Sequence, residues 1–371
     1  MQLIPTRRNN PTTIMKTSEI FRFMVLGALA LSMCSCTEDS PKTVWPEDNA
    51  DTQDVPVAQL GSFAKGADVS WVTELENAGY TFQNQQGTAK ELMELLRDDC
   101  GVNSIRLRVF VNPERDAEIN GWCSVDDAVI KARRAHDLGL RVMIDFHFSD
   151  TWADPGKQGI PSAWEGMTLD ETLAAMTDHV NDMMTALKRY DIEPEWVQIG
   201  NETRTGMMWP LGSYDNEDNF SRMVTAGSRA VKAVFPNATV IVHCDCGNEY
   251  NLYSRLFGKL KVDGAEYDMI GMSLYPDEAT WQKDVNDCIT NVPKVQNEFG
   301  KPVMLCEVGF DYSKPEIAEQ IMSQLMTDGQ NAGLKGIFWW EPEAPSERGY
   351  TKGCFDQNGA PTAALNPFVK D

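Results

Sequence analysis

Two glutamates interrupt apolar runs of the sequence, where an ionised side chain needs a reason. Glu202 ends the stretch VQIGNE before Thr203, and Glu307 lies inside VMLCEVGF. A buried charge is costly unless a cation or hydrogen-bond donors meet it. Facing carboxyl groups, one protonated and one ionised, suit cleavage of a glycosidic bond. Taken singly, Glu307 could instead form a structural pair with an arginine, and Glu202 could be an acid at a helix N-terminus.

The segments that must position these acids alternate regularly. Helical patterns lie between β-rich runs; the one at 124–139 has Ser124 as its expected N-cap and Gly139 just past its end, and another spans 315–333. This alternation predicts an α/β chain with a single (β/α)8 TIM barrel and an active site at the C-terminal ends of the strands. The eight runs are FAKGADVS, SIRLRVFV, RVMIDFHF, EWVQIG, ATVIVHC, DMIGMSLY, PVMLCEVGF and GLKGIFWW.

Both glutamates then end strands, the fourth and the seventh, so they would face each other at one barrel mouth. An arginine from the second strand and the hydroxyl of Tyr275 are the expected partners of Glu307. His147 could instead be a hydrogen-bonded polar residue at the rim. The other polar or aromatic residues at strand ends that we take as candidates are Asp68, Arg106, Arg108, His147, Trp152, Asn201, Asp245 and Trp340.

The charge balance narrows the class of partner. The 371 residues include 33 basic and 55 acidic ones, a formal net charge of -22. This charge opposes long-range attraction to nucleic acid or to an anionic membrane surface and favours a neutral partner. We expect a monomer that binds no nucleic acid.

The N-terminus has the pattern of an export signal. The stretch FRFMVLGALALSMCSC, residues 21–36, is apolar and ends in small residues and cysteine, and Met15 is an alternative start. It resembles a bacterial lipoprotein signal in which Cys36 becomes the lipid anchor; Cys34 or an ordinary cleaved signal are the alternatives. Acidic residues after the cysteine resemble export tags of surface lipoproteins of Gram-negative bacteria, so we expect the outer-membrane surface. The predicted parts are a signal region (1–36), an acidic tether (37–61) and the catalytic barrel (62–371).

The cysteines and histidines do not predict a metal site. An odd number of cysteines follows Cys36, so at least one thiol is free, and we expect buried structural thiols. Cys244 and Cys246 alternate in a strand, and no spacing supplies the further ligands that zinc needs. We expect no metal and no cofactor. His136 and His179 lie within helical patterns and are expected at the surface.

Longer motifs carry a family resemblance. GNE at the end of the fourth strand with a glutamate ending the seventh resembles the large clan of retaining glycoside hydrolases built on this barrel. The segments KGADVS, GVNSIRLRVFVNP, DFHFSDTWADPGKQ, WVQIGNET and FWWEP are similar to glycoside hydrolase family 53, the arabinogalactan endo-β-1,4-galactanases. The similarity spans most of residues 63–345, and the stretch HFSDTWADPGKQ is its most specific part.

The resemblance implies an endo-acting retaining hydrolase of β-1,4-galactan. It makes Glu202 the general acid/base, Glu307 the nucleophile, and Arg106 and Tyr275 the support of that nucleophile. Asn201 would bind the sugar 2-hydroxyl and Trp340 would stack under the sugar, while five further residues would line the cleft: Asp68, Arg108, His147, Trp152 and Asp245. The segment after the seventh strand is short, which puts the calcium site of some family members in doubt. The alternatives are another β-1,4-glycanase of the clan, such as a mannanase, or a non-catalytic glycan-binding lipoprotein.

Overall fold

The computed structural model describes residues 59–369. The predicted signal region, with Cys36, and all but the last residues of the tether lie outside the described residues. Within residues 59–369, no helix combines the length and the apolar character that a membrane span requires.

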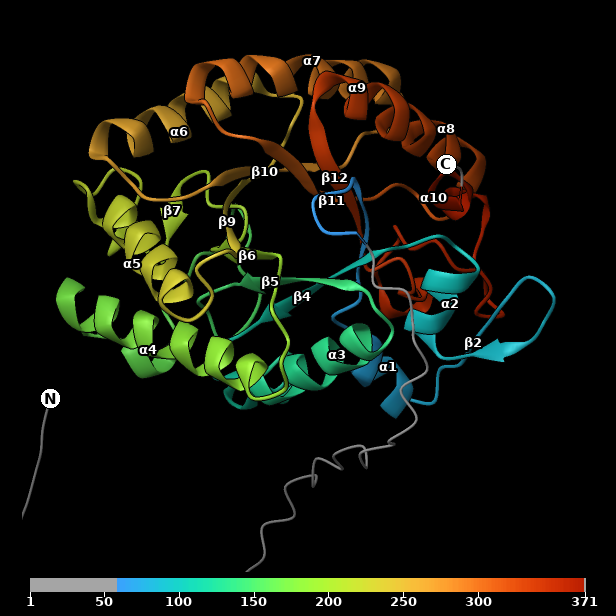
Figure 1. Cartoon of the computed structure of the whole chain (residues 1–371), viewed down its shortest axis with the longest axis horizontal. Coiled ribbons are helices and arrows are strands. Elements are labelled where there is room, and N and C mark those ends of the chain that lie inside the picture. Colours follow the sequence, from blue (N-terminus) through green and yellow to red (C-terminus); the bar gives the residue numbers. More distant parts are fainter. Residues whose placement is uncertain (1–58, 370–371) are drawn as a thin grey trace, which may run out of the picture. The chain divides into compact units, whose positions relative to one another are not determined.

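Eight parallel strands close into a barrel, which confirms the predicted fold (Figure 1). The strands follow the order β1-β12-β11-β10-β9-β6-β5-β4, and β1 pairs with β4 to complete the ring. Each of the eight β-rich runs of the sequence supplies one of them: β1 (Ala64–Asp68), β4 (Ser104–Val109), β5 (Arg141–Phe146), β6 (Trp196–Ile199), β9 (Thr239–Cys244), β10 (Met269–Leu274), β11 (Val303–Val308) and β12 (Leu334–Trp340).

Helices surround the barrel on the outside (Figure 1). They are α1 (Val72–Asn77), α2 (Leu92–Asp98), α3 (Val125–Asp137), α4 (Leu169–Lys188), α5 (Asn219–Val234), α6 (Tyr250–Asp263), α7 (Trp281–Phe299), α8 (Pro315–Gln324), α9 (Gln330–Ala332) and α10 (Asn366–Val369). Two short hairpins lie in the connections: β2 (Phe82–Gln83) with β3 (Ala89–Lys90), and β7 (Gly206–Met207) with β8 (Gly212–Ser213). The predicted start of α3 is confirmed, because the Ser124 hydroxyl accepts a hydrogen bond from the Asp127 amide.

The helix expected over 315–333 forms, but it is not a regular α-helix throughout. It changes at Leu325–Gly329 into a π-helical turn before α9, so one extra residue enters the turn. A Cβ atom at Gly329 would lie 2.8 Å from Leu334 Cδ1. The glycine therefore lets the wider turn approach the first side chain of β12, a contact that the periodicity alone does not reveal.

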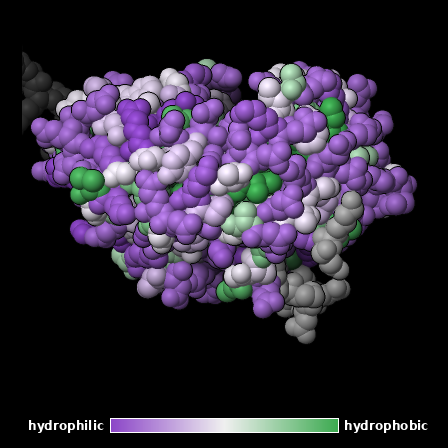
Figure 2. Space-filling model, turned by 90° about the horizontal axis from the view of Figure 1, so that it is seen from above, coloured by the Kyte–Doolittle hydropathy of each residue, from purple (hydrophilic) through white to green (hydrophobic). Residues whose placement is uncertain are grey.

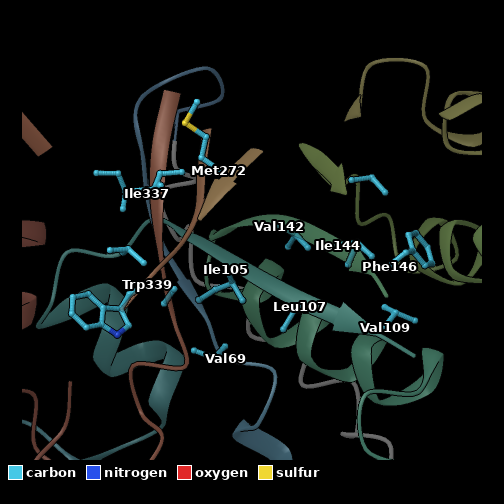
Figure 3. Close-up of a cluster of buried hydrophobic side chains, with 14 of the residues drawn as sticks. Val69, Ile105, Leu107, Val109, Val142, Ile144, Phe146, Met272, Ile337 and Trp339 are labelled. Carbon is cyan, nitrogen blue, oxygen red and sulfur yellow. The ribbon is translucent and has the colours of Figure 1, made fainter. Parts of the chain in front are cut away.

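The outward faces of the strands form the main core with the helices (Figure 3). Because successive strand residues point to opposite faces, alternate positions of β4 and β5 supply apolar side chains to this layer. These are Ile105, Leu107 and Val109 from β4, and Val142, Ile144 and Phe146 from β5. The face of the molecule in Figure 2 is mostly hydrophilic, in keeping with the high net charge.

The inward faces divide into two layers. Near the strand starts, an apolar lower layer consists of Ala64, Met143, Trp196, Ile241, Met269, Met304, Cys306 and Phe338. A Cβ atom at Gly66 would lie 2.2 Å from the Phe338 ring, so the glycine in β1 leaves room for that ring. Toward the strand ends, the interior becomes polar and charged. This upper layer consists of Asp68, Arg106, Arg108, Asp145, Gln198, His243, Ser273 and Glu307, all of them buried.

Candidate active site

A β-bulge in β11 directs Glu307 into the upper layer. Met272 of β10 is opposite Leu305, but the next residue, Ser273, is opposite Glu307, so Cys306 is the extra residue. Cys306 packs in the apolar lower layer, and its neighbour Glu307 still points inward. Bulges next to active sites commonly redirect a side chain in this way. The bulge therefore places an acid where regular alternation would have turned it outward.

Arg106 of β4 is the centre of the charged upper layer. Its guanidinium lies 2.7 Å from Asp68 Oδ2, 2.8 Å from Asp145 Oδ2 and 2.9 Å from Glu307 Oε1. The side-chain oxygen of Asn201 accepts from the same guanidinium at 3.0 Å. Arg106 is fully buried, so these ion pairs act in a region that excludes water. The predicted contact between the arginine of the second strand and Glu307 is confirmed.

Glu307 experiences opposing electrostatic influences. Burial raises its pKa to about 7, and the charge of Asp145 adds to this rise. Arg106 and the Tyr275 hydroxyl, which donates to Glu307 Oε2 at 2.8 Å, act in the opposite direction. Both donors stabilise the carboxylate, so Glu307 is the more easily ionised acid of the pair.

Glu202 lies just past β6, in a backbone turn that includes Gly200 at φ 81° and Glu202 itself at φ 46°. Such left-handed conformations are uncommon for residues with a side chain and mark positions that the surroundings impose. Burial raises the Glu202 pKa to about 8, and the negative charge of Glu307 contributes to the rise. The Ser273 hydroxyl donates to Glu202 Oε1 at 2.7 Å. Ionisation of Glu307 therefore favours the protonated form of Glu202.

The two acids share one cleft. Its volume is about 330 Å³, and its wall includes His147, Trp152, Asn201, Glu202, Tyr275, Glu307 and Trp340. An adjoining hollow of about 390 Å³ is also lined by Glu202 and Tyr275. Asp245, expected in the cleft, lines this second hollow and not the first. The two hollows meet at Glu202 and Tyr275, so an extended ligand could continue past Glu202 from one hollow into the other.

Asp68 and Arg108 do not line the cleft as expected. Both side chains are fully buried and lie within the upper layer. Arg108 pairs with Glu341, and its guanidinium carbon lies 4.2 Å from the centroid of the Trp152 ring and 5.6 Å from that of Trp340. These cation–π contacts hold the aromatic rings that do reach the cleft. The sequence located the residues at strand ends but did not show which strand-end side chains are covered by others.

His147 is both a cleft residue and a fully paired one. Its Nδ1 accepts from the Ala153 amide at 2.9 Å, and its Nε2 lies 3.0 Å from Asp145 Oδ2. Only 3% of the residue is exposed, although it contributes to the cleft wall. These contacts fix the ring, so His147 fits both predictions made from the sequence: it is a hydrogen-bonded residue at the rim and it also lines the cleft.

Comparison with known proteins gives the family of this chain. The sequence profile of Glycosyl hydrolase family 53 matches residues 64–332, which cover most of the barrel. The chain belongs to glycosyl hydrolase family 53. As a member of that family it is a glycoside hydrolase, and the resemblance stated from the motifs is confirmed.

Relatives of the family 53 chain agree in sequence and fold. An arabinogalactan endo-β-1,4-galactanase A of Emericella nidulans is 30% identical over 318 residues, covering 79% of this chain and 88% of the relative. An endo-β-1,4-galactanase of Bacillus subtilis is 30% identical and covers 76% of this chain and 70% of its own length. A structure from a study of two fungal β-1,4-galactanases superposes with a TM-score of 0.76 at 27% identity, covering 83% of this chain and 99% of that one. A family 53 catalytic domain from Ignisphaera aggregans has a TM-score of 0.74 at 26% identity, covering 85% and 98%.

Several site residues of the family 53 chain were not proposed from the sequence. Asp145 interrupts the apolar run RVMIDF as Glu307 interrupts its own, and that signal could have found it. Gln198, at the inward position before Asn201, could have been found from the period of two along β6. Ser273 carries no comparable signal, because a serine in a strand is ordinary.

The predictions for the cysteines and for His136 agree with the structure, and the prediction for His179 does not. The thiols of the described residues are free, and all are buried except Cys246, which is partly exposed. His136 is exposed as expected, but His179 is buried against Phe146 and Trp164, so its expected surface position is wrong. It occupies the inner side of α4, and burial lowers its pKa to about 4. Over residues 59–369, no group of three or more His, Cys, Asp or Glu side chains is placed to hold a metal ion.

Proposed function

We propose that this glycoside hydrolase cleaves internal β-1,4-galactosidic bonds of galactan with retention of configuration. Glu307 acts as the nucleophile and Glu202 as the general acid/base. The observation that supports this assignment is the difference between the two acids in one cleft. Glu307 is held by Arg106 and Tyr275, and Glu202, with its higher pKa, is held by an uncharged hydroxyl.

The reaction takes place in two displacements. In the first, Glu307 attacks the anomeric carbon while Glu202 gives its proton to the departing glycosidic oxygen. In the second, Glu202 removes a proton from a water molecule, which attacks the same carbon and releases Glu307. The first step needs Glu307 ionised and Glu202 protonated, a division that the ion pair of Arg106 with Glu307 supports. In the second step Glu202 is ionised and acts as the base, while Glu307 is bound to the sugar as an ester until it leaves as a carboxylate.

Two further residues bind the sugar at the cleavage point. Asn201 directs its oxygen to Arg106 and donates one amide hydrogen to the Ala153 carbonyl at 2.9 Å. Its second amide hydrogen is available to the sugar 2-hydroxyl. Trp340 lines the cleft and is fixed edge-on by Trp71 and Tyr350, so its ring offers a platform for a pyranose face.

The choice of galactan rests on the names of the relatives and on charge. The relatives from Emericella nidulans and Bacillus subtilis are named as endo-β-1,4-galactanases. A chain with a net charge of -22 repels polyanions, and galactan is neutral. Each link of galactan leaves the sugar through an axial oxygen at C4, so its chain bends where β-1,4-mannan and β-1,4-glucan are extended.

A substrate panel tests the choice. Purified protein is incubated with galactan, mannan, xylan and cellulose, and reducing ends are followed. Galactan turnover should exceed the others by roughly a hundredfold, because one polar group left unpaired in a misfitted sugar costs up to ~3 kcal/mol. The viscosity of galactan should fall before free galactose accumulates. Comparable rates on mannan would assign the chain to a mannanase-like activity, and galactose as the sole early product would indicate exo cleavage.

The assignment of the two acids has its own test. Glu202→Ala should still form a glycosyl-enzyme from a substrate with an activated aryl leaving group, and azide should restore turnover with a β-configured product. Glu307→Ala should not respond in that way. Azide rescue exchanged between the two variants, or inverted products from natural galactan, would contradict the assignment.

We propose in addition that Cys36 carries a lipid that anchors the enzyme at the outer-membrane surface. The proposal rests on the apolar stretch before Ser35 and on the acidic residues after Cys36. Radiolabelled palmitate should label the parent chain but not Cys36→Ala, and this variant should leave the membrane fraction. A parent chain without label would overturn the anchor, and resistance of the parent chain to external protease on intact cells would overturn the surface location.

A further inference from the structure

Behind Glu202 lies a chain of hydrogen bonds that the two displacements do not use. The Ser273 Oγ of β10 lies 2.7 Å from Glu202 Oε1 and also 2.7 Å from His243 Nε2 of β9. The other ring nitrogen, Nδ1, faces the backbone amide of Glu202 at 3.4 Å and the Gln198 amide nitrogen at 3.1 Å. The chain thus begins at the Glu202 backbone and returns to the Glu202 carboxyl.

The donors around His243 give this chain a direction. Burial and the charge of Arg106 lower the His243 pKa to about 3, so the ring is neutral and carries one N–H. The Glu202 backbone N–H, which can only donate, points at Nδ1 at 3.4 Å, which makes Nδ1 an acceptor and places the hydrogen on Nε2. The Gln198 amide donates first to Asp145 Oδ1 at 2.5 Å, and its second hydrogen lies near Nδ1. Asn201 Oδ1 also lies 2.9 Å from Nδ1, but the Asn201 amide is oriented by other partners: its oxygen accepts from Arg106 and its nitrogen donates to the Ala153 carbonyl. With this tautomer, Nε2–H donates to Ser273, and the Ser273 hydroxyl donates to Glu202.

We propose that His243 and Ser273 are positioning residues that hold Glu202 Oε1 through this one-way chain of donors and leave Oε2 for the glycosidic oxygen and the water. The proposal rests on the acid/base role proposed above for Glu202. Neither residue touches substrate or changes its own protonation. The chain fixes which carboxyl oxygen faces the reaction and stabilises the carboxylate that appears when the proton leaves.

An uncharged chain suits the surroundings of Glu202. The charged and titratable groups that face Glu202 or line its cleft include four acids and three cations, and the cation that lowers its pKa, Arg106, is engaged with Glu307. They are Arg106, Asp145, His147, Asp154, Lys157, His243, Asp245, Tyr275, Glu307, Tyr350 and Lys352. A second cation beside Glu202 would ionise it before the first displacement. A neutral hydroxyl donor stabilises the carboxylate less strongly and keeps the proton in use.

The first test is the pH profile of kcat/KM on galactan for Ser273→Ala. Loss of the donor should reduce kcat/KM by about tenfold and move the alkaline limb, which reports Glu202, upward by about one pH unit. Ser273→Thr keeps the hydroxyl and should restore both values. Ser254→Ala is the matched control, because Ser254 also donates to a glutamate, Glu298 at 3.1 Å, on the exposed side of α6; its profile should equal that of the parent chain.

An unchanged limb in Ser273→Ala would overturn the proposal, and so would a downward shift, which would mean that Glu202 donates to Ser273. Glu202→Gln separates this failure from a failure of the proposed function. If Glu202 is the acid/base, this variant loses turnover of galactan whatever Ser273 does. If Glu202→Gln keeps its turnover, the proposed role of Glu202 is wrong instead.

The second test observes the histidine directly and needs no turnover. The chain has four histidines, so ¹⁵N-labelled imidazole signals can be assigned with His243→Gln. The His243 ring should be neutral at pH 6 with its hydrogen on Nε2. In Ser273→Ala the Nε2–H signal should shift, because its acceptor is gone. A hydrogen on Nδ1 would reverse the chain and overturn the proposal.

Discussion

The two layers inside the barrel come from the inward faces of the same strands, but one is apolar and the other is polar and charged. The lower layer is closed by side chains such as Met304 and Phe338, and the upper layer by Arg106 and the acids around it. Apolar burial in the lower layer is favourable by itself, at roughly 25 cal/mol per Å² of surface removed from water. The charges of the upper layer lose their hydration, and only their ion pairs and hydrogen bonds offset the free energy lost with it. The lower layer therefore stabilises the fold, and the upper layer reduces that stability in exchange for a chemically prepared site.

The largest effect that tests this comparison is on activity. Glu307→Ala removes the nucleophile from the upper layer, so turnover of galactan should fall by a factor of roughly 10⁴ or more. The melting temperature should change little, because Arg106 keeps Asp68 and Asp145 as partners. Steady-state assays and calorimetry on one preparation measure both values. A variant that unfolds would show that Glu307 is a structural ion-pair partner first.

In the lower layer the expected effect is on stability. Phe338 is fully buried beside Gly66, so Phe338→Ala opens a cavity and should reduce the free energy of unfolding by about 3–5 kcal/mol. Below its melting temperature the variant should keep kcat and the pH profile of the parent chain. Denaturant unfolding and kinetics at low temperature make the comparison. A loss of kcat in folded protein would mean that the two layers are not independent.

A smaller effect should follow pH. The Glu202 pKa rises from its ordinary 4.5 to about 8 in the folded chain, chiefly through burial, so the folded state binds this proton more tightly than the unfolded state. Stability from this group is fully present below pH 4.5 and is lost as pH rises through about 8. Glu202→Gln has no such loss, so its melting temperature should exceed that of the parent chain by several degrees at pH 8 and by little at pH 4.

Glu165→Gln, at an exposed position, is the control for this titration and should follow the parent chain at every pH. A constant difference between Glu202→Gln and the parent chain from pH 4 to pH 8 would mean that burial of the Glu202 charge does not destabilise the fold.

The sequence predicted the secondary structure better than the contacts between side chains of different elements. The β-rich runs, and the helix signals at Ser124 and Gly139, identified the strands and helices, because both are local. Glu202 and Glu307 could be selected because acids in apolar runs are costly. The positions of Asp68 and Arg108 beneath the cleft could not, since burial at a strand end depends on side chains from other parts of the chain, such as Trp152 in the segment after β5.

The bulge at Cys306 also escaped the sequence. Nothing in VMLCEVGF shows that two consecutive residues point inward, and strict alternation would place either Cys306 or Glu307 outside. The choice is made by packing, because Cys306 fits the apolar lower layer and Glu307 finds Arg106 above it. Long-range partners of this kind decide what local propensity leaves open.

The smallest expected effect concerns metal ions and bears on how the upper layer balances its charge. Carboxyl groups there outnumber Arg106 and Arg108, and such an excess can be met either by a bound cation or by protons. The second is indicated, because burial raises the pKa of Glu307 in this layer to about 7, and likewise raises to about 7 that of Glu341, which adjoins the layer and pairs with Arg108. The segment between β11 and α8 spans only residues 309–314, too short for a dedicated calcium loop. A chelator should therefore leave both turnover of galactan and melting temperature within error of the untreated enzyme, whereas acidification should change both. A large loss of activity on chelation that calcium restores would show that a cation, and not protons, completes the upper layer.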